Sequence, residues 1–133
     1  MTAAESITQK LIDRNYRISF AETITGGGIA KKIIEIPGSS RVIDFSVIFY
    51  SNDSKSDFLN VKSETLEKYG AVSEQAVCEM AEGIAAVSRS DVSLAASGIA
   101  GPNGATANKP IGMMCFALKI GDDMSTSTCR LAG

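Results

Sequence analysis

The sequence predicts an α/β domain: a three-layer α/β/α sandwich around a five-stranded mixed sheet. Segments whose apolar residues recur at helical spacing alternate with short, largely apolar segments rich in β-branched residues. That alternation favours helices packed on both faces of a mostly parallel sheet. The last two apolar segments are separated only by residues 121–123, which is typical of an antiparallel hairpin. The sheet is therefore expected to contain both kinds of strand pairing.

The first half of the chain predicts the order helix, strand, helix, strand. A capping box that begins at Thr2 precedes an amphipathic helix over residues 3–15. Residues 17–21, RISFA, predict a short strand. The helical spacing that follows ends at PGSS, residues 37–40, because proline cannot continue a helix. Residues 41–50, RVIDFSVIFY, are largely apolar, which predicts a strand buried on both faces.

The second half predicts a polar loop that enters a short helix, then two further helices and three strands. Ser63 begins a helix that closes at Gly70. Ser73 is a good N-cap for a helix through about Val87. The apolar face of that helix is expected to hold Val77, Met80, Ala81 and Ile84. The remaining apolar segments predict strands over residues 91–97, 111–120 and 124–131.

Composition and charge restrict the class of protein. A chain of 133 residues with 44% apolar residues fits one compact domain, residues 1–133. The net charge is −2 and the basic residues are spread along the chain, so the basic patch of a nucleic-acid binder is missing. No apolar stretch approaches the ~18 residues that a membrane helix needs. We expect neither a nucleic acid nor a membrane as a partner, and we expect a cytoplasmic location.

Histidine and cysteine usage restricts the chemistry. The chain contains no histidine, which removes histidine general bases and histidine metal ligands. The three cysteines are widely spaced without a CxxC pair, so neither a disulfide framework nor a thiolate metal site is predicted. We interpret each as a small buried hydrophobic residue: Cys78, Cys115 and Cys129. Covalent chemistry in this chain would need a base other than histidine.

Three polar stretches follow predicted strands, at residues 22–28, 50–55 and 97–110. Ligands of open α/β sheets bind beyond the carboxyl ends of the strands, so these stretches are expected to converge on one crevice. In the first stretch, glycines at 26–28 follow a strand and begin a helix. Their N–H groups suit an anion or a developing oxyanion, and a simple tight turn is the alternative.

Hydroxyl and charged side chains in these stretches are the candidates for chemistry. Thr23 is a candidate nucleophile, whereas Thr25 also suits the cap of the following helix. Without histidine, a hydroxyl needs a neutral amine to take its proton, and Lys55 and Lys109 lie in the other two stretches. A solvated helix residue is the alternative for Lys55, and a plain loop exit is the alternative to a phosphate or ribose contact for Lys109. Glu22 is either a substrate-binding carboxylate or an acid at a helix start.

Five ordered sequence blocks resemble one known family. They are AETITGGGIAKKI, PGSS, YSNDSK, GAVSEQAVCEMAEG and SGIAGPNGATANKPIG. In order and spacing they are similar to the signature blocks of the carboxy-terminal domain of CinA, the competence- and damage-inducible protein, which is the nicotinamide mononucleotide amidohydrolase family. The resemblance runs from about the first helix to nearly the last residue.

The resemblance implies a fold, an activity and a set of site residues. It implies a usually oligomeric α/β/α domain, here a homo-oligomer, that hydrolyses the carboxamide of nicotinamide mononucleotide to nicotinate mononucleotide and ammonia without metal or cofactor. The family's serine nucleophile corresponds to Thr23 and its general-base lysine to Lys55, and Tyr50 joins them in the catalytic site. The remaining implied contacts, to the substrate or the oxyanion, are Glu22, Thr25, Gly26, Gly27, Asn52, Ser97, Gly98, Gly101, Gly104 and Lys109.

Several positions depart from the family pattern. Thr23 replaces the serine, and its extra methyl group restricts χ1. Phe45 and Ser46 stand in place of two glycines, Ser97 in place of a threonine and Asn60 in place of a glycine. The sequence ends at LAG, where the family continues into a final helix, so we expect either that the sequence is truncated or that this domain lacks the family's final segment. These departures leave a second hypothesis, a catalytically weakened or inactive nucleotide-binding protein with a regulatory role.

Overall fold

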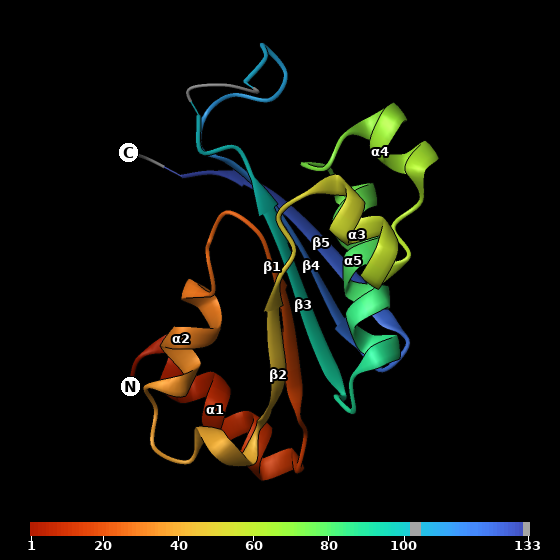
Figure 1. Ribbon diagram of the computed structural model, residues 1–133. Helices are drawn as coiled ribbons and strands as arrows, with labels where there is room; N and C mark the ends of the chain where they lie inside the picture. Colours follow the sequence, from red (N-terminus) through yellow and green to blue (C-terminus); the bar gives the residue numbers. More distant parts are fainter. Residues whose placement is uncertain (102–104, 132–133) are drawn as a thin grey trace.

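The computed structural model describes residues 1–101 and 105–131, and these form the predicted mixed sheet of five strands (Figure 1). The strands lie in the order β2-β1-β3-β4-β5. The central strand pairings, β1 with β2 and β1 with β3, are parallel, whereas β3–β4 and β4–β5 are antiparallel. The strands are β1 (Ile18–Glu22), β2 (Ile43–Ile48), β3 (Val92–Gly98), β4 (Met113–Ile120) and β5 (Asp123–Arg130).

Helices cover both faces of the sheet, which confirms the predicted three-layer α/β/α fold (Figure 1). On one face lie α1 (Ala3–Arg14) and α2 (Gly28–Ile34), followed by a short 3-10 turn, Ser39–Arg41. On the other face lie α3 (Asn52–Leu59), α4 (Ser63–Tyr69) and α5 (Glu74–Val87).

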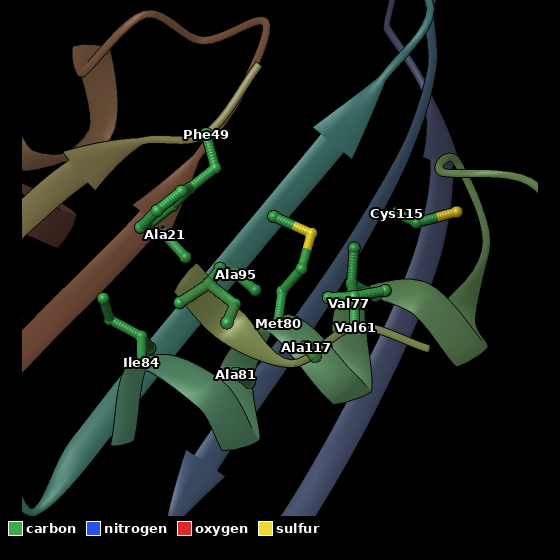
Figure 2. Packing of buried hydrophobic residues seen from close by; sticks show 11 residues of the cluster. Ala21, Phe49, Val61, Val77, Met80, Ala81, Ile84, Ala95, Cys115 and Ala117 are labelled. Atoms are coloured by element: carbon green, nitrogen blue, oxygen red, sulfur yellow. The ribbon is translucent and has the colours of Figure 1, made fainter. Parts of the chain in front are cut away.

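The core on the α5 face is built around the apolar side of α5. Ser73 caps the helix as predicted, since its hydroxyl accepts a hydrogen bond from the Ala76 N–H. Figure 2 shows the α5 side chains packed against small residues of the strands, an arrangement that lets the helix lie close to the sheet. All four residues predicted for this face are fully buried: Val77, Met80, Ala81 and Ile84.

A second core lies between the sheet and α1 and α2. The predicted capping box at Thr2 is present, and α1 ends at Arg14 because Asn15 takes a left-handed conformation. Ile7 of α1 is 44% exposed, whereas the neighbouring Thr8 is buried. The buried apolar residues of this core are Leu11, Ile18, Phe20, Ala30, Ile33, Val42 and Val92.

The structure corrects two predictions about exposure. Residues 41–50 were expected to form a strand buried on both faces, but β2 covers only Ile43–Ile48 and is partly exposed because it forms an edge of the sheet. Cys129 was expected to be buried, but it lies exposed on β5, the other edge strand. Both errors arise because apolar content does not reveal which strands lie at the edges.

Candidate active site

The three polar stretches follow the carboxyl ends of β2, β1 and β3, which are neighbours in the sheet (Figure 1). The β1–β2 pairing continues past the strands, since the Phe49 N–H donates to the Glu22 carbonyl at 2.8 Å. The residues just beyond these strand ends include Thr23 after β1 and Tyr50 after β2, and Ser97 lies at the end of β3. Sheet topology therefore brings the three polar stretches to one end of the molecule.

Lys55 is a buried lysine in α3, the helix that follows β2. This helix begins where a polar loop was predicted because Ser51 caps it by accepting from the Ser54 N–H. The Lys55 side chain is 2% exposed, and its Nζ donates to the Tyr50 carbonyl oxygen at 2.8 Å. Within residues 1–101 and 105–131, no carboxylate lies within 4.0 Å of its Nζ. Burial lowers the pKa of the amine, so the solvated-helix alternative for Lys55 is wrong.

Thr23 is buried between β1 and β3. It is 4% exposed, and its Oγ1 donates to the Ala96 carbonyl oxygen at 3.0 Å. The preceding Glu22 side chain turns toward α2. Because side chains alternate along an extended chain, the Thr23 side chain is expected on the opposite side, where α3 carries Lys55.

Glu22 organises the start of α2. Its Oε1 accepts from the Thr25 hydroxyl at 2.6 Å and from the Ile29 N–H at 3.0 Å, and its Oε2 accepts from the Ala30 N–H at 3.0 Å. This confirms the helix-start interpretation of Glu22. Thr25 was expected as the helix cap, but the N-cap residue is Gly27, and the Glu22 carboxylate does the capping. An acid that reaches forward from the preceding strand replaces the local cap.

The glycine turn connects β1 to α2 through two left-handed residues. Gly26 has φ +61° and Gly27 has φ +89°, conformations that a residue with a Cβ adopts only with strain. The Gly26 N–H donates to the Thr23 carbonyl at 3.0 Å, so it is used within the turn. The N–H groups of Thr25 and Gly27 have no partner among the described residues. These two amides are the candidates for an oxyanion contact.

Tyr50 and Asn52, predicted at the second stretch, lie on the surface. The Tyr50 side chain is 71% exposed, and its backbone carbonyl, not its phenol, contacts Lys55. Asn52 is exposed in the first turn of α3, where it lines a hollow of about 220 Å³ with Ser63 and Glu67 of α4. The phenol and the amide are therefore available to a ligand only from the solvent side.

Phe45, one of the departures from the family pattern, packs on the α5 side of β2. Its ring is partly buried against the core around α5. It lines a hollow of about 470 Å³ with Phe58 of α3 and Val87 of α5. Asn60, another departure, has φ +58° at the C-cap of α3, a left-handed conformation that asparagine tolerates better than most residues.

The third stretch divides between the carboxyl end of β3 and the α4 side of the molecule. Ser97 is buried at 2% exposure. Gly98 lies so close to β4 that a Cβ would stand 2.0 Å from the Met114 sulfur. Gly101 has φ +77°, and the prediction for Gly104 lies outside the described residues. The Lys109 ammonium donates to the Tyr69 carbonyl at the end of α4, so this side chain is held by α4 in the structure.

Among residues 1–101 and 105–131, no group of three or more acidic or cysteine side chains is arranged to hold a metal ion. No helix in this part of the chain is both long enough and apolar enough to cross a membrane.

Backbone atoms supply the site contacts that sequence patterns missed. The Ala96 carbonyl accepts a hydrogen bond from the Thr23 hydroxyl, and the Tyr50 carbonyl accepts one from the Lys55 amine. Every residue has such a carbonyl, so the residue types at 50 and 96 give no signal for these contacts. Only a weak indication in the sequence shows that Glu22 bonds to the start of α2: an acidic residue at the end of a strand, just before a glycine turn.

The fold defines an α/β/α domain with a buried lysine and a buried hydroxyl near the carboxyl ends of parallel strands. The family model described as the CinA C-terminal domain matches residues 1–133. The chain belongs to this family, which confirms the resemblance of its five sequence blocks.

Relatives and solved structures agree with this assignment. A CinA-like protein of Fervidobacterium nodosum is 44% identical over 127 residues, which cover 96% of this chain and 31% of the relative. A putative competence-damage inducible protein of Acetivibrio thermocellus is 46% identical over 123 residues, which cover 92% and 30%. The chain thus spans less than a third of either relative.

Two solved structures share the fold closely. The competence/damage inducible protein of Agrobacterium tumefaciens has a TM-score of 0.91 and 40% identity, with 96% of this chain and 78% of that chain covered. The competence or damage-inducible protein of Enterobacter asburiae has a TM-score of 0.93 and 35% identity, with 98% and 82% covered.

Proposed function

We propose that this domain hydrolyses the carboxamide of nicotinamide mononucleotide to nicotinate mononucleotide and ammonia. The observation that carries the proposal is Lys55, a lysine 2% exposed, without a carboxylate partner among the described residues. Burial lowers the pKa of its amine, which favours the neutral form that a general base needs. Membership of the CinA C-terminal domain family supports the choice of substrate.

In the proposed mechanism, Thr23 is the nucleophile and Lys55 is the base. The Thr23 oxygen attacks the amide carbon while the neutral Lys55 amine takes the hydroxyl proton. Lys55 then delivers that proton to the nitrogen as the carbon–nitrogen bond breaks, and ammonia leaves. Water hydrolyses the resulting ester, which releases the carboxylate and restores the hydroxyl. No metal and no cofactor enters this sequence.

The remaining predicted residues have supporting roles in the proposal. The Thr25 and Gly27 N–H groups stabilise the oxyanion, a contribution of about 3 kcal/mol per donor in comparable acyl transfers. Tyr50 and Asn52 contact the substrate from the solvent side. Ser97 and the loop that follows it bind the ribose phosphate, and Lys109 joins them if it leaves the Tyr69 carbonyl. Three free cysteines are compatible with a reducing cytoplasm.

One observation favours a second candidate, a nucleotide-binding protein with little or no turnover. The Thr23 hydroxyl donates to the Ala96 carbonyl, so its proton does not point at an amine. Its branched side chain has fewer accessible χ1 rotamers than serine, which hinders the rotation that attack requires. Such a protein would gain thermal stability from the nucleotide without forming product, by about 2.7 kcal/mol at a ligand concentration of 100 Kd.

Ammonia release from nicotinamide mononucleotide tests the proposal. We expect activity in the wild-type chain and a loss of about 10²- to 10⁴-fold in Lys55→Met, which fills the same buried space without an amine. Lys10→Met, on the exposed face of α1, is the matched control and should retain full activity. Ligand-induced stabilisation with no ammonia from the wild type would support the binding protein instead.

Thr23→Ser tests whether the threonine only hinders the nucleophile. The serine keeps the hydroxyl and loses the methyl group, so we expect a rate increase of about tenfold, equivalent to about 1.4 kcal/mol of barrier. Thr23→Val keeps the shape and should be inactive. Equal rates for threonine and valine at this position would exclude Thr23 as the nucleophile.

A further inference from the structure

The outer edge of β5 is open. β5 is the last strand in the sheet order, and no other segment within residues 1–101 and 105–131 pairs with its outer side. Every residue of β5 except Met124 is exposed. β5 pairs with β4 over the full length of both strands, from Asp123 opposite Ile120 to Arg130 opposite Met113. An edge strand of this length presents a row of unpaired N–H and C=O groups to the solvent.

The β4–β5 pairing identifies which backbone groups face outward. The Leu131 N–H donates to the Gly112 carbonyl, so Leu131 stands opposite Gly112, one step along the chain from the opposed pair Met113 and Arg130. In an antiparallel ladder, hydrogen-bonded residues alternate with residues that point away. Residues 123, 125, 127 and 129 therefore bond to β4. The outward groups belong to Met124, Thr126, Thr128 and Arg130.

The opposite edge of the sheet is protected, in contrast to β5. The Val42 carbonyl accepts from the Ile18 N–H of β1, so the next carbonyl, that of Ile43, points to the free side of β2. There the Arg17 guanidinium donates to the Ile43 carbonyl at 3.1 Å and forms an ion pair with Asp44 at 3.3 Å. A charged side chain that covers an edge is a common device against strand pairing.

β5 carries none of these protective devices. Residues 124–129, MSTSTC, contain no proline and no charge. Charges occur only at the two ends: Asp122 and Asp123 at the start, and Arg130 at the end. A strand that is acidic at its start and basic at its end is complementary to itself when two copies run in opposite directions.

We propose that β5 pairs with β5 of a second copy of this chain, antiparallel and about a two-fold axis at Thr126. Outward residues must oppose outward residues, so the axis passes through a residue position and not between two residues. The axis at Thr126 sets Met124 opposite Thr128 of the second copy and Asp122 opposite Arg130 of the second copy. An axis at Ser127 sets Met124 opposite Arg130 and loses the charge match. The result is one continuous sheet across both copies.

The charges on the α5 face of the edge bear on this pairing. The Glu74 carboxylate accepts from the Thr126 and Thr128 hydroxyls, so one Glu74 from each copy lies near the axis. Lys119 is paired with Met124 and lies on the same face. In the proposed register Met124 stands opposite Thr128 of the second copy, so Lys119 lies on the side where the second copy carries Glu74. The positive charge of Lys119 then offsets the repulsion between the two Glu74 carboxylates.

Dilution experiments on the purified chain test the pairing. Light scattering after size exclusion and sedimentation equilibrium should show a dimer that dissociates on dilution. Thr126→Pro removes an outward N–H and leaves the β4 ladder intact, so it should give a monomer. Thr126→Val loses the hydroxyl bond to Glu74 but keeps the N–H, and it should remain dimeric. A wild-type monomer at high concentration would overturn the proposal, as would a dimer that Thr126→Pro leaves unchanged.

Charge reversal tests the register. Arg130→Asp places acidic groups opposite Asp122 twice in each dimer, so it should raise the dimer Kd about tenfold or more. The double variant Asp122→Arg with Arg130→Asp restores opposite charges and should recover the wild-type Kd. Failure of the double variant to recover would overturn the Thr126 register. None of these measurements depends on the proposed activity.

Discussion

Lys55 and Glu22 are two buried charged residues at the carboxyl end of the sheet, and they are stabilised in different ways. The Glu22 carboxylate accepts from three donors at the start of α2, whereas the Lys55 amine has one partner among the described residues, the Tyr50 carbonyl. A buried ion with few partners has a destabilised charged form. Lys55 therefore carries a desolvation cost that a structural lysine would avoid, which is why the proposed function depends on it.

The cost at Lys55 predicts a pH dependence of stability. Its pKa is lower in the folded chain than the ordinary 10.5, so between the folded pKa and 10.5 the unfolded state binds more protons than the folded state. The free energy of unfolding of the wild type should then rise with pH across this window. Lys55→Met lacks the titrating amine and its desolvation cost, so we expect it to be more stable than the wild type at neutral pH. The difference in the free energy of unfolding should shrink as the pH approaches 10.5. Urea titrations of both proteins between pH 7 and pH 10 would check this.

Glu22 predicts a stability loss that a surface acid would not show. Glu22→Gln keeps the size of the side chain but replaces one carboxylate oxygen by an NH₂ group. Because all three partners of Glu22 are donors, the NH₂ group faces another donor and a hydrogen bond is lost. We expect a loss of about 2 kcal/mol in the free energy of unfolding. Glu35→Gln, an exposed acid at the end of α2, should change it by less than about 0.5 kcal/mol. Equal effects in urea denaturation would contradict the capping role of Glu22.

At the scale of elements, α3 is held against α5 by a close backbone approach. A Cβ at Gly83 of α5 would lie 2.2 Å from the carbonyl oxygen of Leu59, the last residue of α3, and 2.8 Å from its Cα. Only glycine permits this contact, since both obstructing atoms belong to the backbone. The approach fixes the helix that carries Lys55 against the α5-side core.

Gly83→Ala is therefore expected to damage both stability and the candidate site. Alanine favours a helix by about 1 kcal/mol over glycine, but here the overlap with α3 should outweigh that gain and destabilise by about 2 kcal/mol or more. Displacement of α3 should also expose Lys55 and raise its pKa toward the ordinary value. Thermal unfolding and the pH dependence described for Lys55 would measure the two effects, and a more stable variant would contradict this account.

At the scale of the whole molecule, the two edges of the sheet differ. Arg17 covers the β2 edge, whereas the β5 edge is open and is separated from β1 by β3 and β4. Dimerisation through β5 would leave the carboxyl ends of β1 and β2 outside the interface.

This arrangement predicts that stability depends on protein concentration. If two copies pair through β5, association stabilises the folded state, and the Tm of the wild type should rise with concentration. The Tm of Thr126→Pro should be independent of concentration. Calorimetry over a hundredfold concentration range would measure both, and a flat Tm for the wild type would contradict the pairing.

Local sequence patterns predicted most of the fold. The capping box at Thr2, the N-cap at Ser73 and the buried face of α5 all follow from short-range periodicity and hydrogen bonding, which depend on neighbours within a few residues. The errors occurred where position in the sheet matters. β2 and Cys129 were expected to be buried, but both lie at sheet edges.

The α/β/α class, the family and the residue types at the carboxyl ends of the strands can all be predicted from the amino-acid order, because periodicity, turn residues and ordered motifs are properties of the chain. Three features became evident only in the folded chain: Lys55 is buried with no carboxylate partner among the described residues, Glu22 caps α2, and the Thr23 hydroxyl donates to the Ala96 carbonyl. These features depend on folding because burial and hydrogen-bond partners are set by backbone segments distant in sequence, such as β3 beside β1 and α5 beside α3.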